Sequence, residues 1–273
     1  ISGFGRCSTT VVLPVLAAMG GECCPLLTAC LSAHTAFPAS EKATFLDLTG
    51  QMAGTAAHWA ELGVTFDAIY SGFLGSERQI GILHRLLSEF RRKETLVLVD
   101  PVMGDYGRVY QTYTAAMCSG MARLAELADV ITPNLTEAAL LLGQPYETLP
   151  AGEAGLREIT ERLSLGGRRS VVLTGASLAP GRTGAVCFDA RTGKTEAVQT
   201  AYVAHEFHGT GDVFSSVLTG ALVRGESLSS AAGEAAAFVR ACAERTAAED
   251  LPMREGVDFE PLLGLLIPGK ETV

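Results

Sequence analysis

The sequence lacks an excess of positive charge. Its 273 residues include 21 Lys and Arg against 30 Asp and Glu, which gives a formal net charge of −9. An acidic protein does not attract nucleic acid or an anionic membrane through its overall field, so we predict neither as a partner. An anionic substrate would need a local trap made of backbone N–H groups, a metal ion or a few cations.

Long apolar runs and paired cysteines are also scarce. Between Arg6 and Glu41 the only formal charge is Glu22, but Pro14 and Pro25 divide this stretch into pieces shorter than the ~20 apolar residues of a membrane helix. No targeting segment is evident. The seven cysteines are odd in number and form no C-x-x-C pair. This favours reduced cysteines in a cytoplasmic protein and argues against zinc.

The chain does contain a regular alternation of short apolar runs and helical patterns. Helices are predicted over residues 7–19, 51–62, 76–92, 113–127, 134–142, 153–165, 211–224 and 227–247. Strands are predicted over residues 23–29, 66–73, 95–100, 129–132, 170–174, 184–189 and 194–203. Alternation of this kind predicts a mostly parallel sheet, doubly wound with helices on both faces, and the last two strands predict an antiparallel edge.

The beginning of the chain is unusual for such a fold. Ile1 is followed almost at once by a turn and a helix, where a leading strand is normally found. We therefore expect residues 1–273 to form a single α/β domain that lacks its first β-strand. The hydrophobic content of 48% is enough for one large core.

Ligands of doubly wound sheets bind beyond the carboxyl ends of the strands, so polar residues that follow strands are candidate site residues. These candidates are Gly72-Phe73, the segment from Asp100 to Asp105, the segment from Thr132 to Asn134, Thr174-Gly175 and the loop before residue 211.

The strongest motif is the segment from His208 to Ser216, which opens a long apolar helix. Gly209 and Gly211 allow a tight turn that points N–H groups outward, at a helix N-terminus with partial positive charge. Such a turn can trap phosphate oxygens, and Asp212 is placed to accept a proton from a hydroxyl that attacks the phosphate. The alternative is a simple glycine turn in which Asp212 caps the helix.

A second motif combines an amide and a carboxylate. Asn134 and Glu137 are three residues apart, so on a helix they share a face and suit a magnesium ion that keeps several waters. The alternative, compatible with the first, is a capping box. Asp100 could contact the metal through water, and Asp105 lies in a Gly-rich loop, residues 104–112, that could close over a nucleotide.

These motifs together resemble the ribokinase-like superfamily. Its signature is similar to Gly209-Thr210-Gly211-Asp212, and the resemblance implies that the glycines form an anion hole while Asp212 is the catalytic base. The segments 100–105 and 132–137, with Thr174-Gly175, resemble the vitamin-kinase branch of that superfamily. The resemblance implies ATP and Mg²⁺, with a possible monovalent cation, and a homodimer. It also implies nucleotide contacts, which fall on Asp105, Thr132, Asn134, Glu137, Thr174 and Gly175, and metal contacts on Asp100, Asn134 and Glu137.

Within that branch, residues 2–8, 31–37 and 71–76 are similar to pyridoxal and pyridoxamine kinases. The resemblance implies phosphorylation of the 5′-hydroxymethyl group of a vitamin B6 vitamer. It places substrate contacts at Gly3, Phe4, His34, Thr35 and Phe73. Phe73 keeps an aromatic face where relatives often carry Tyr, and His34 has a structural alternative as a satisfied core histidine.

Three other functions stay open. A hydroxymethylpyrimidine kinase of thiamine synthesis would share the anion hole and the Asp-Pro-Val-Met segment. A non-catalytic vitamer-binding protein would bind pyridoxal without turnover of ATP. The third is a dinucleotide-binding dehydrogenase, because residues 3–8 nearly match its G-x-G-x-x-G motif, but Ser8 replaces the third glycine and no acidic residue ends the next strand.

Overall fold

A computed structural model describes residues 1–38, 40–205 and 207–269. Its helices are α1 (Thr9–Ala18), α2 (Thr49–Glu61), α3 (Glu77–Phe90), α4 (Ala115–Ala125), α5 (Leu135–Leu142), α6 (Gly152–Leu163), α7 (Thr210–Val223) and α8 (Leu228–Ala248). Short 3-10 helices cover Tyr146–Thr148, Met253–Glu255 and Glu260–Leu266. The strands are β1 (Ala29–Leu31), β2 (Phe45–Asp47), β3 (Ala68–Ser71), β4 (Leu96–Val99), β5 (Gly104–Asp105), β6 (Arg108–Val109), β7 (Val130–Ile131), β8 (Ser170–Thr174), β9 (Arg182–Asp189) and β10 (Lys194–Ala201).

The chain divides into two compact units. The first unit contains residues 1–50 and the chain from residue 200 onward, and the second contains residues 51–199. Each unit has its own buried core. The prediction of a single domain over the whole chain stays a prediction.

The second unit is built on a six-stranded sheet of order β10-β9-β8-β7-β4-β3. Strands β3, β4, β7 and β8 run parallel, while β9 pairs antiparallel with β8, with Thr174 opposite Ala185. Branched apolar side chains such as Val99 and Ile131 are fully buried, as expected for strands covered on both faces. The predicted mostly parallel sheet with an antiparallel edge is confirmed.

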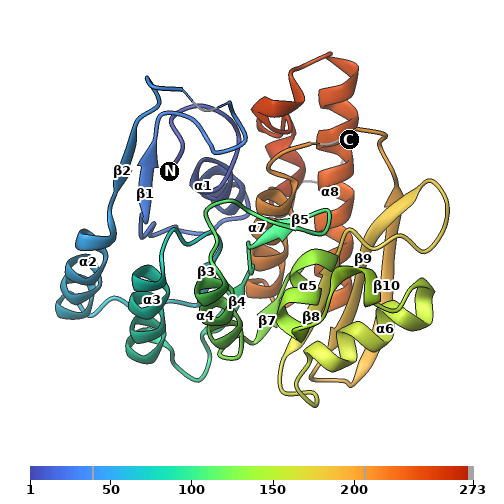
Figure 1. Cartoon of the computed structure of the whole chain (residues 1–273), viewed down its shortest axis with the longest axis horizontal. Coiled ribbons are helices and arrows are strands. Elements are labelled where there is room, and N and C mark those ends of the chain that lie inside the picture. Colours follow the sequence, from blue (N-terminus) through green and yellow to red (C-terminus); the bar gives the residue numbers. More distant parts are fainter. Residues whose placement is uncertain (39, 206, 270–273) are drawn as a thin grey trace. The chain divides into compact units, whose positions relative to one another are not determined.

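Helices α3 to α6 connect the parallel strands of this sheet (Figure 1). Each connection moves in the same direction along the sheet, so right-handed crossovers place these helices on one face. Helix α3 begins at Ser76, whose side chain accepts a hydrogen bond from the Gln79 N–H, and α4 begins in the same way at Thr114. All four carboxyl ends of the parallel strands therefore lie along one edge of the sheet.

The first unit packs α7 against α8 and α1 against α7. Small residues allow this close packing, since a Cβ added to Gly220 would lie 2.5 Å from the Met19 sulfur. Strands β1 and β2 form a separate antiparallel pair, visible in blue in Figure 1. The start of α7, which carries the strongest sequence motif, is thus held by a well-packed helix pair.

Two local predictions were wrong. The strand predicted over residues 23–29 lies instead at 29–31, because Pro25 has no N–H for a ladder and the partner strand β2 faces only Ala29 to Leu31. The Gly-rich loop over 104–112 contains a small hairpin of β5 and β6. Gly104 is required there, since a Cβ would lie 2.3 Å from the Arg108 carbonyl oxygen.

In the part of the chain that the structure describes, every helix is too short or too polar to cross a membrane.

Candidate active site

Helix α7 begins at a glycine turn. Gly209 is the N-cap residue and has φ of 76°, a left-handed conformation that glycine adopts without strain. Among the residues that the structure describes, no side chain caps this helix start. The N–H groups of the first turn have no acceptor within the helix, so they keep their capacity to bind an anion. This is the geometry predicted for Gly209, Thr210 and Gly211.

Asp212 lies in the first turn of α7, with its side chain half-buried. Its Oδ2 accepts hydrogen bonds from the backbone N–H of Ser8 at 2.7 Å and from the Cys7 thiol at 3.3 Å. Among the described residues no donor reaches the other oxygen, Oδ1. Burial raises the pKa of Asp212, and the two donors oppose that rise. The carboxylate is therefore oriented through one oxygen only.

The predicted substrate residues of the first unit lie in an aromatic cluster. The His34 ring is 4.7 Å from Phe37 and 5.7 Å from His208, and Phe37 is 5.5 Å from Phe4, measured between ring centroids. Phe4 is half exposed, and the predicted contacts Gly3 and Thr35 are exposed as well.

His34 itself is buried, and backbone groups engage both of its ring nitrogens. Nε2 lies 2.8 Å from the Arg254 carbonyl oxygen, and Nδ1 accepts from the Ala36 N–H at 3.3 Å. Burial lowers the pKa of His34. The structural alternative for this residue therefore has direct geometric support, and a substrate contact would use the ring rather than its nitrogens.

A cavity of about 270 Å³ opens beside this cluster in the first unit. Its lining includes the predicted substrate contacts Gly3 and Phe4, together with Glu255 and Glu260. It therefore combines an aromatic face with polar groups, as expected for a small-molecule site.

In the second unit the predicted nucleotide and metal residues follow the ends of the parallel strands, as predicted. Asp100 follows β4, Thr132 follows β7, and Thr174 ends β8. Thr174 donates from its N–H at 2.9 Å and from its hydroxyl at 3.3 Å to the Pro133 carbonyl. Gly175 is exposed with φ of 66°. The strand ends are thus tied to one another by hydrogen bonds.

Asn134 and Glu137 form the capping box of α5. The Asn134 side chain accepts from the Glu137 N–H at 3.0 Å, and Glu137 Oε2 accepts from the Asn134 N–H at 2.9 Å. Glu137 Oε1 also accepts from the Met103 N–H at 3.1 Å, and Asn134 Nδ2 donates to the Gly104 carbonyl at 2.9 Å. The structural alternative from the sequence is confirmed, and it leaves the metal role untested.

The same place concentrates negative charge. Glu137 and Asp100 are both buried, and burial together with the nearby Asp100 carboxylate raises the pKa of Glu137 well above its usual range. Asp105, exposed on the β5–β6 hairpin, adds to this effect. Carboxylates that repel one another in a buried place fit a divalent cation. Within the described ranges no group of three or more His, Cys, Asp or Glu side chains is arranged to hold a metal ion.

Comparisons with known proteins decide the family. A family model described as phosphomethylpyrimidine kinase matches residues 13–256. A pyridoxine/pyridoxal/pyridoxamine kinase of Bordetella bronchiseptica is 31% identical over 253 residues, covering 89% of this chain and 86% of the relative. The chain belongs to the phosphomethylpyrimidine and pyridoxal kinase family.

Solved members of this family have the same fold. A Bacteroides thetaiotaomicron protein assigned to the phosphomethylpyrimidine kinases, crystallised with pyridoxal, is 40% identical with a TM-score of 0.91, covering 97% of this chain and 92% of that one. Pyridoxal kinase from Lactobacillus plantarum is 30% identical with a TM-score of 0.87, covering 97% and 93%. The predicted ribokinase-like α/β fold is therefore confirmed.

Three residues that contact the predicted site residues were not assigned a role from the sequence. Cys7 and Ser8 contact Asp212 from about 200 residues away in the chain, a separation that no local pattern reveals. Tyr113 packs edge-on against Phe73 at 5.9 Å and is buried, and burial raises its pKa. The signal that could have found Cys7 and Ser8 is their place within the segment 2–8, which resembles the kinases.

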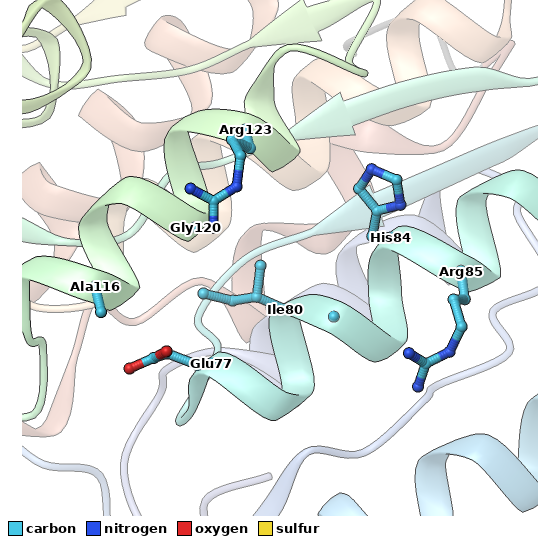
Figure 2. A pocket seen from close by; sticks show the side chains of 8 residues that line it. Glu77, Ile80, His84, Arg85, Ala116, Gly120 and Arg123 are labelled. Atoms are coloured by element: carbon cyan, nitrogen blue, oxygen red, sulfur yellow. The ribbon is translucent and has the colours of Figure 1, made fainter.

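A larger hollow of about 340 Å³ lies between α3 and α4 of the kinase fold (Figure 2). Ile80 and Gly120 form its floor, and Glu77, His84 and Arg123 stand exposed around it. It contains none of the predicted site residues. Its charged groups lie at the surface, unlike the buried carboxylates at the strand ends.

Proposed function

We propose that this protein transfers the γ-phosphoryl group of ATP to the 5′-hydroxymethyl group of a vitamin B6 vitamer. The observation that carries the proposal is the start of α7, where an uncapped glycine turn adjoins a carboxylate with one oxygen open. Phosphoryl transfer depends on charge stabilisation and positioning, and this helix start provides both. The kinases among its relatives support the same reaction.

In this mechanism the chain supplies the anion hole and the base. The backbone N–H groups of Gly209 to Asp212 stabilise charge on the transferring phosphoryl group. Asp212 Oδ1 accepts the proton of the substrate hydroxyl as its oxygen attacks phosphorus, and ADP leaves on the opposite side. The positive end of α7 favours the ionised carboxylate that this step needs.

The carboxylates at the strand ends would hold magnesium. Asp100, Asn134 and Glu137 are the assigned residues, and Mg²⁺ bound there would neutralise charge on the nucleotide phosphates. Glu137 Oε2 already accepts from the Asn134 N–H and Oε1 from the Met103 N–H, so we assign Glu137 and Asn134 a contact with the metal through water.

The remaining contacts follow the strand ends and the aromatic cluster. Nucleotide contacts are assigned to Asp105, Thr132, Asn134, Glu137, Thr174 and Gly175. Substrate contacts are assigned to Gly3, Phe4, His34, Thr35 and Phe73.

A second substrate has specific support. The matching family model is described as phosphomethylpyrimidine kinase, so hydroxymethylpyrimidine is an alternative acceptor. Both acceptors present a hydroxymethyl group on an aromatic nitrogen ring, and the same base and anion hole would serve either.

The test measures ADP release with a coupled assay. Pyridoxal, pyridoxamine, pyridoxine and hydroxymethylpyrimidine are assayed in parallel. We expect the highest kcat/KM with a B6 vitamer, together with a requirement for Mg²⁺. A preference for hydroxymethylpyrimidine would select the second substrate. Pyridoxal binding without ADP release would contradict the proposal and indicate a vitamer-binding protein, and NAD binding would indicate the dehydrogenase alternative.

Two further properties belong to the proposal. A homodimer is expected from the family resemblance, and the molar mass in solution by light scattering tests it. A cytoplasmic location is supported by seven cysteines that are free in the structure. A disulfide found in the purified native protein would argue against that location.

A further inference from the structure

The turn at residues 5–8 has a conformation that local sequence preference does not favour. Ser8 has φ of 59° and ψ of −133°, although it is not glycine. Such a conformation persists only where the surroundings enforce it, and it often marks a functional constraint. Its consequence is that the Ser8 N–H points at Asp212 Oδ2, at 2.7 Å. The Cys7 thiol reaches the same oxygen at 3.3 Å.

Close packing within the first unit holds this turn in place. A Cβ on Gly209 would lie 2.2 Å from the Arg6 carbonyl oxygen, and one on Gly256 would lie 2.5 Å from it. The Arg6 N–H donates to the Glu255 carbonyl at 2.7 Å. The Arg6 guanidinium pairs with Asp258 at 3.0 Å and with Glu260 at 2.7 Å. The turn is therefore clamped between the start of α7 and the segment after α8.

We propose that Cys7 is a positioning residue for the phosphoryl transfer, acting with the Ser8 N–H. Together they fix Asp212 Oδ2, so that Oδ1 faces the substrate hydroxyl. This inference rests on the proposed function, because it assumes that Asp212 is the base. It goes beyond that function by assigning a role to a thiol that is not among the proposed substrate or nucleotide contacts.

The electrostatic surroundings of Asp212 are simple enough to test this role. Helix α1, packed against α7, carries no titratable side chain between Thr9 and Ala18. On α8, which also packs against α7, the charged side chains pair elsewhere: Arg240 with Glu244, Arg245 with Glu249 and Asp258, and Glu234 with Arg224. Arg6 is occupied by Asp258 and Glu260. Cys7 is the titratable group that contacts the carboxylate in the described part of the unit.

Coupling between the two groups runs both ways. Burial first, and then the Asp212 charge, raise the pKa of the Cys7 thiol. Conversely, the thiol lowers the pKa of Asp212 against the effect of burial. If the two side chains are in contact, a substitution of either one must therefore change the pKa of the other.

The kinetic test compares Cys7→Ala with Cys7→Ser. Alanine removes the donor, so the pKa of Asp212 should rise and the acidic limb of the kcat–pH profile should move to higher pH. At low pH, kcat should therefore fall about three- to tenfold. Serine keeps a donor and should restore the wild-type profile, while KM for ATP stays unchanged in both. Unaltered profiles in Cys7→Ala, or a change in KM alone, would overturn the positioning role.

A second readout does not depend on turnover. Alkylation of Cys7 by iodoacetamide, resolved by peptide mass spectrometry, is measured against pH in wild type and Asp212→Asn. Removing the carboxylate should raise the alkylation rate near pH 8 about tenfold. Cys118 is the internal control, since its pKa is raised by burial without any Asp212 contribution. Equal Cys7 rates in the two proteins would overturn the contact.

The two tests separate this inference from the proposed function. A wild-type protein that turns over none of the four alcohols would overturn the proposed function, whatever the alkylation result. An active wild type with unchanged Cys7 alkylation in Asp212→Asn would overturn the positioning role alone.

Discussion

Helices α5 and α7 both begin with polar side chains, and they use them in opposite ways. At α5 the capping box closes the helix start, and both Glu137 oxygens accept backbone hydrogen bonds. At α7 no side chain of the described residues caps the helix, and Asp212 points one oxygen at the turn of residues 5–8. The capped N-terminus of α5 contributes to stability. The first N–H groups of α7 have no capping acceptor, which costs stability and leaves them available for an anion.

This difference separates structural carboxylates from reactive ones. Glu137 holds the start of α5 together through backbone hydrogen bonds, and the proposed metal contact would be added to that task. Burial raises the pKa of the Asp212 carboxyl group. This side chain does not cap its own helix. Substitutions at the two sites should therefore have opposite effects on the free energy of unfolding.

The largest effect is expected for Asp212→Asn. Loss of a general base lowers kcat about 10²- to 10⁴-fold. Stability should not fall, because the folded-state pKa lies above the unfolded one and the ionised carboxylate destabilises the fold at neutral pH. This cost is absent below about pH 4 and grows as pH rises through the raised pKa, so the Tm advantage of Asp212→Asn should grow likewise.

Steady-state kinetics and thermal melts at several pH values check both parts. The control is Glu226→Gln, since pairing with Arg224 lowers the pKa of Glu226. That exposed pair contributes about 0.2–1 kcal/mol, so this variant should lose a little stability and keep its kcat. Near-normal kcat in Asp212→Asn would refute the assignment of the base.

Glu137→Ala should lower stability, where Asp212→Asn should not. It leaves the Met103 and Asn134 N–H groups without their acceptor in a buried place, at a cost of about 2–4 kcal/mol in the free energy of unfolding. Urea denaturation measures this loss. The surface variant Glu153→Ala, which breaks only an exposed pair with Arg157, should lose less than about 1 kcal/mol. Equal losses would show that the capping box is not a stabilising feature.

Gly209→Ala tests the close packing at α7. The added Cβ meets the Arg6 carbonyl, and the left-handed backbone adds strain, so we expect a loss of about 2–3 kcal/mol and a fall in kcat. Gly225→Ala is the matched control, because its φ is 87° and nothing lies within 4 Å of the added Cβ. This variant should pay only the backbone strain of about 1 kcal/mol. Similar melting curves for the two variants would contradict the clamped turn.

The smallest effect is expected for Asn134→Ala compared with Thr114→Ala. Each removes an N-cap in the second unit and should cost about 1 kcal/mol. Only Asn134→Ala should also raise the Mg²⁺ concentration needed for half-maximal ADP release. A parallel shift in Thr114→Ala would indicate that the metal effect follows stability and not the side chain.

Much of the fold could be predicted because its signals are local. Apolar runs such as Leu96 to Val99 and the periodicity of residues 76–92 predicted the sheet and its helices, and Asn134 with Glu137 predicted the capping box. Strand β2 could not be predicted, since its three residues are too few to show an alternating pattern and all of them are exposed. The engagement of His34 by the Arg254 carbonyl and the contact of Cys7 with Asp212 join residues more than 200 positions apart. Such contacts depend on the tertiary fold and leave no periodic trace.

The central claim is that the open helix start grips a terminal phosphate beside an ionised carboxylate. A crystal structure of the protein with Mg²⁺, ADP, aluminium fluoride and pyridoxal tests it directly. The account predicts fluoride within hydrogen-bond distance of the N–H groups of Gly211 and Asp212, and the vitamer hydroxyl next to Asp212 Oδ1. Fluoride bound elsewhere, with the start of α7 covered by protein, would contradict it.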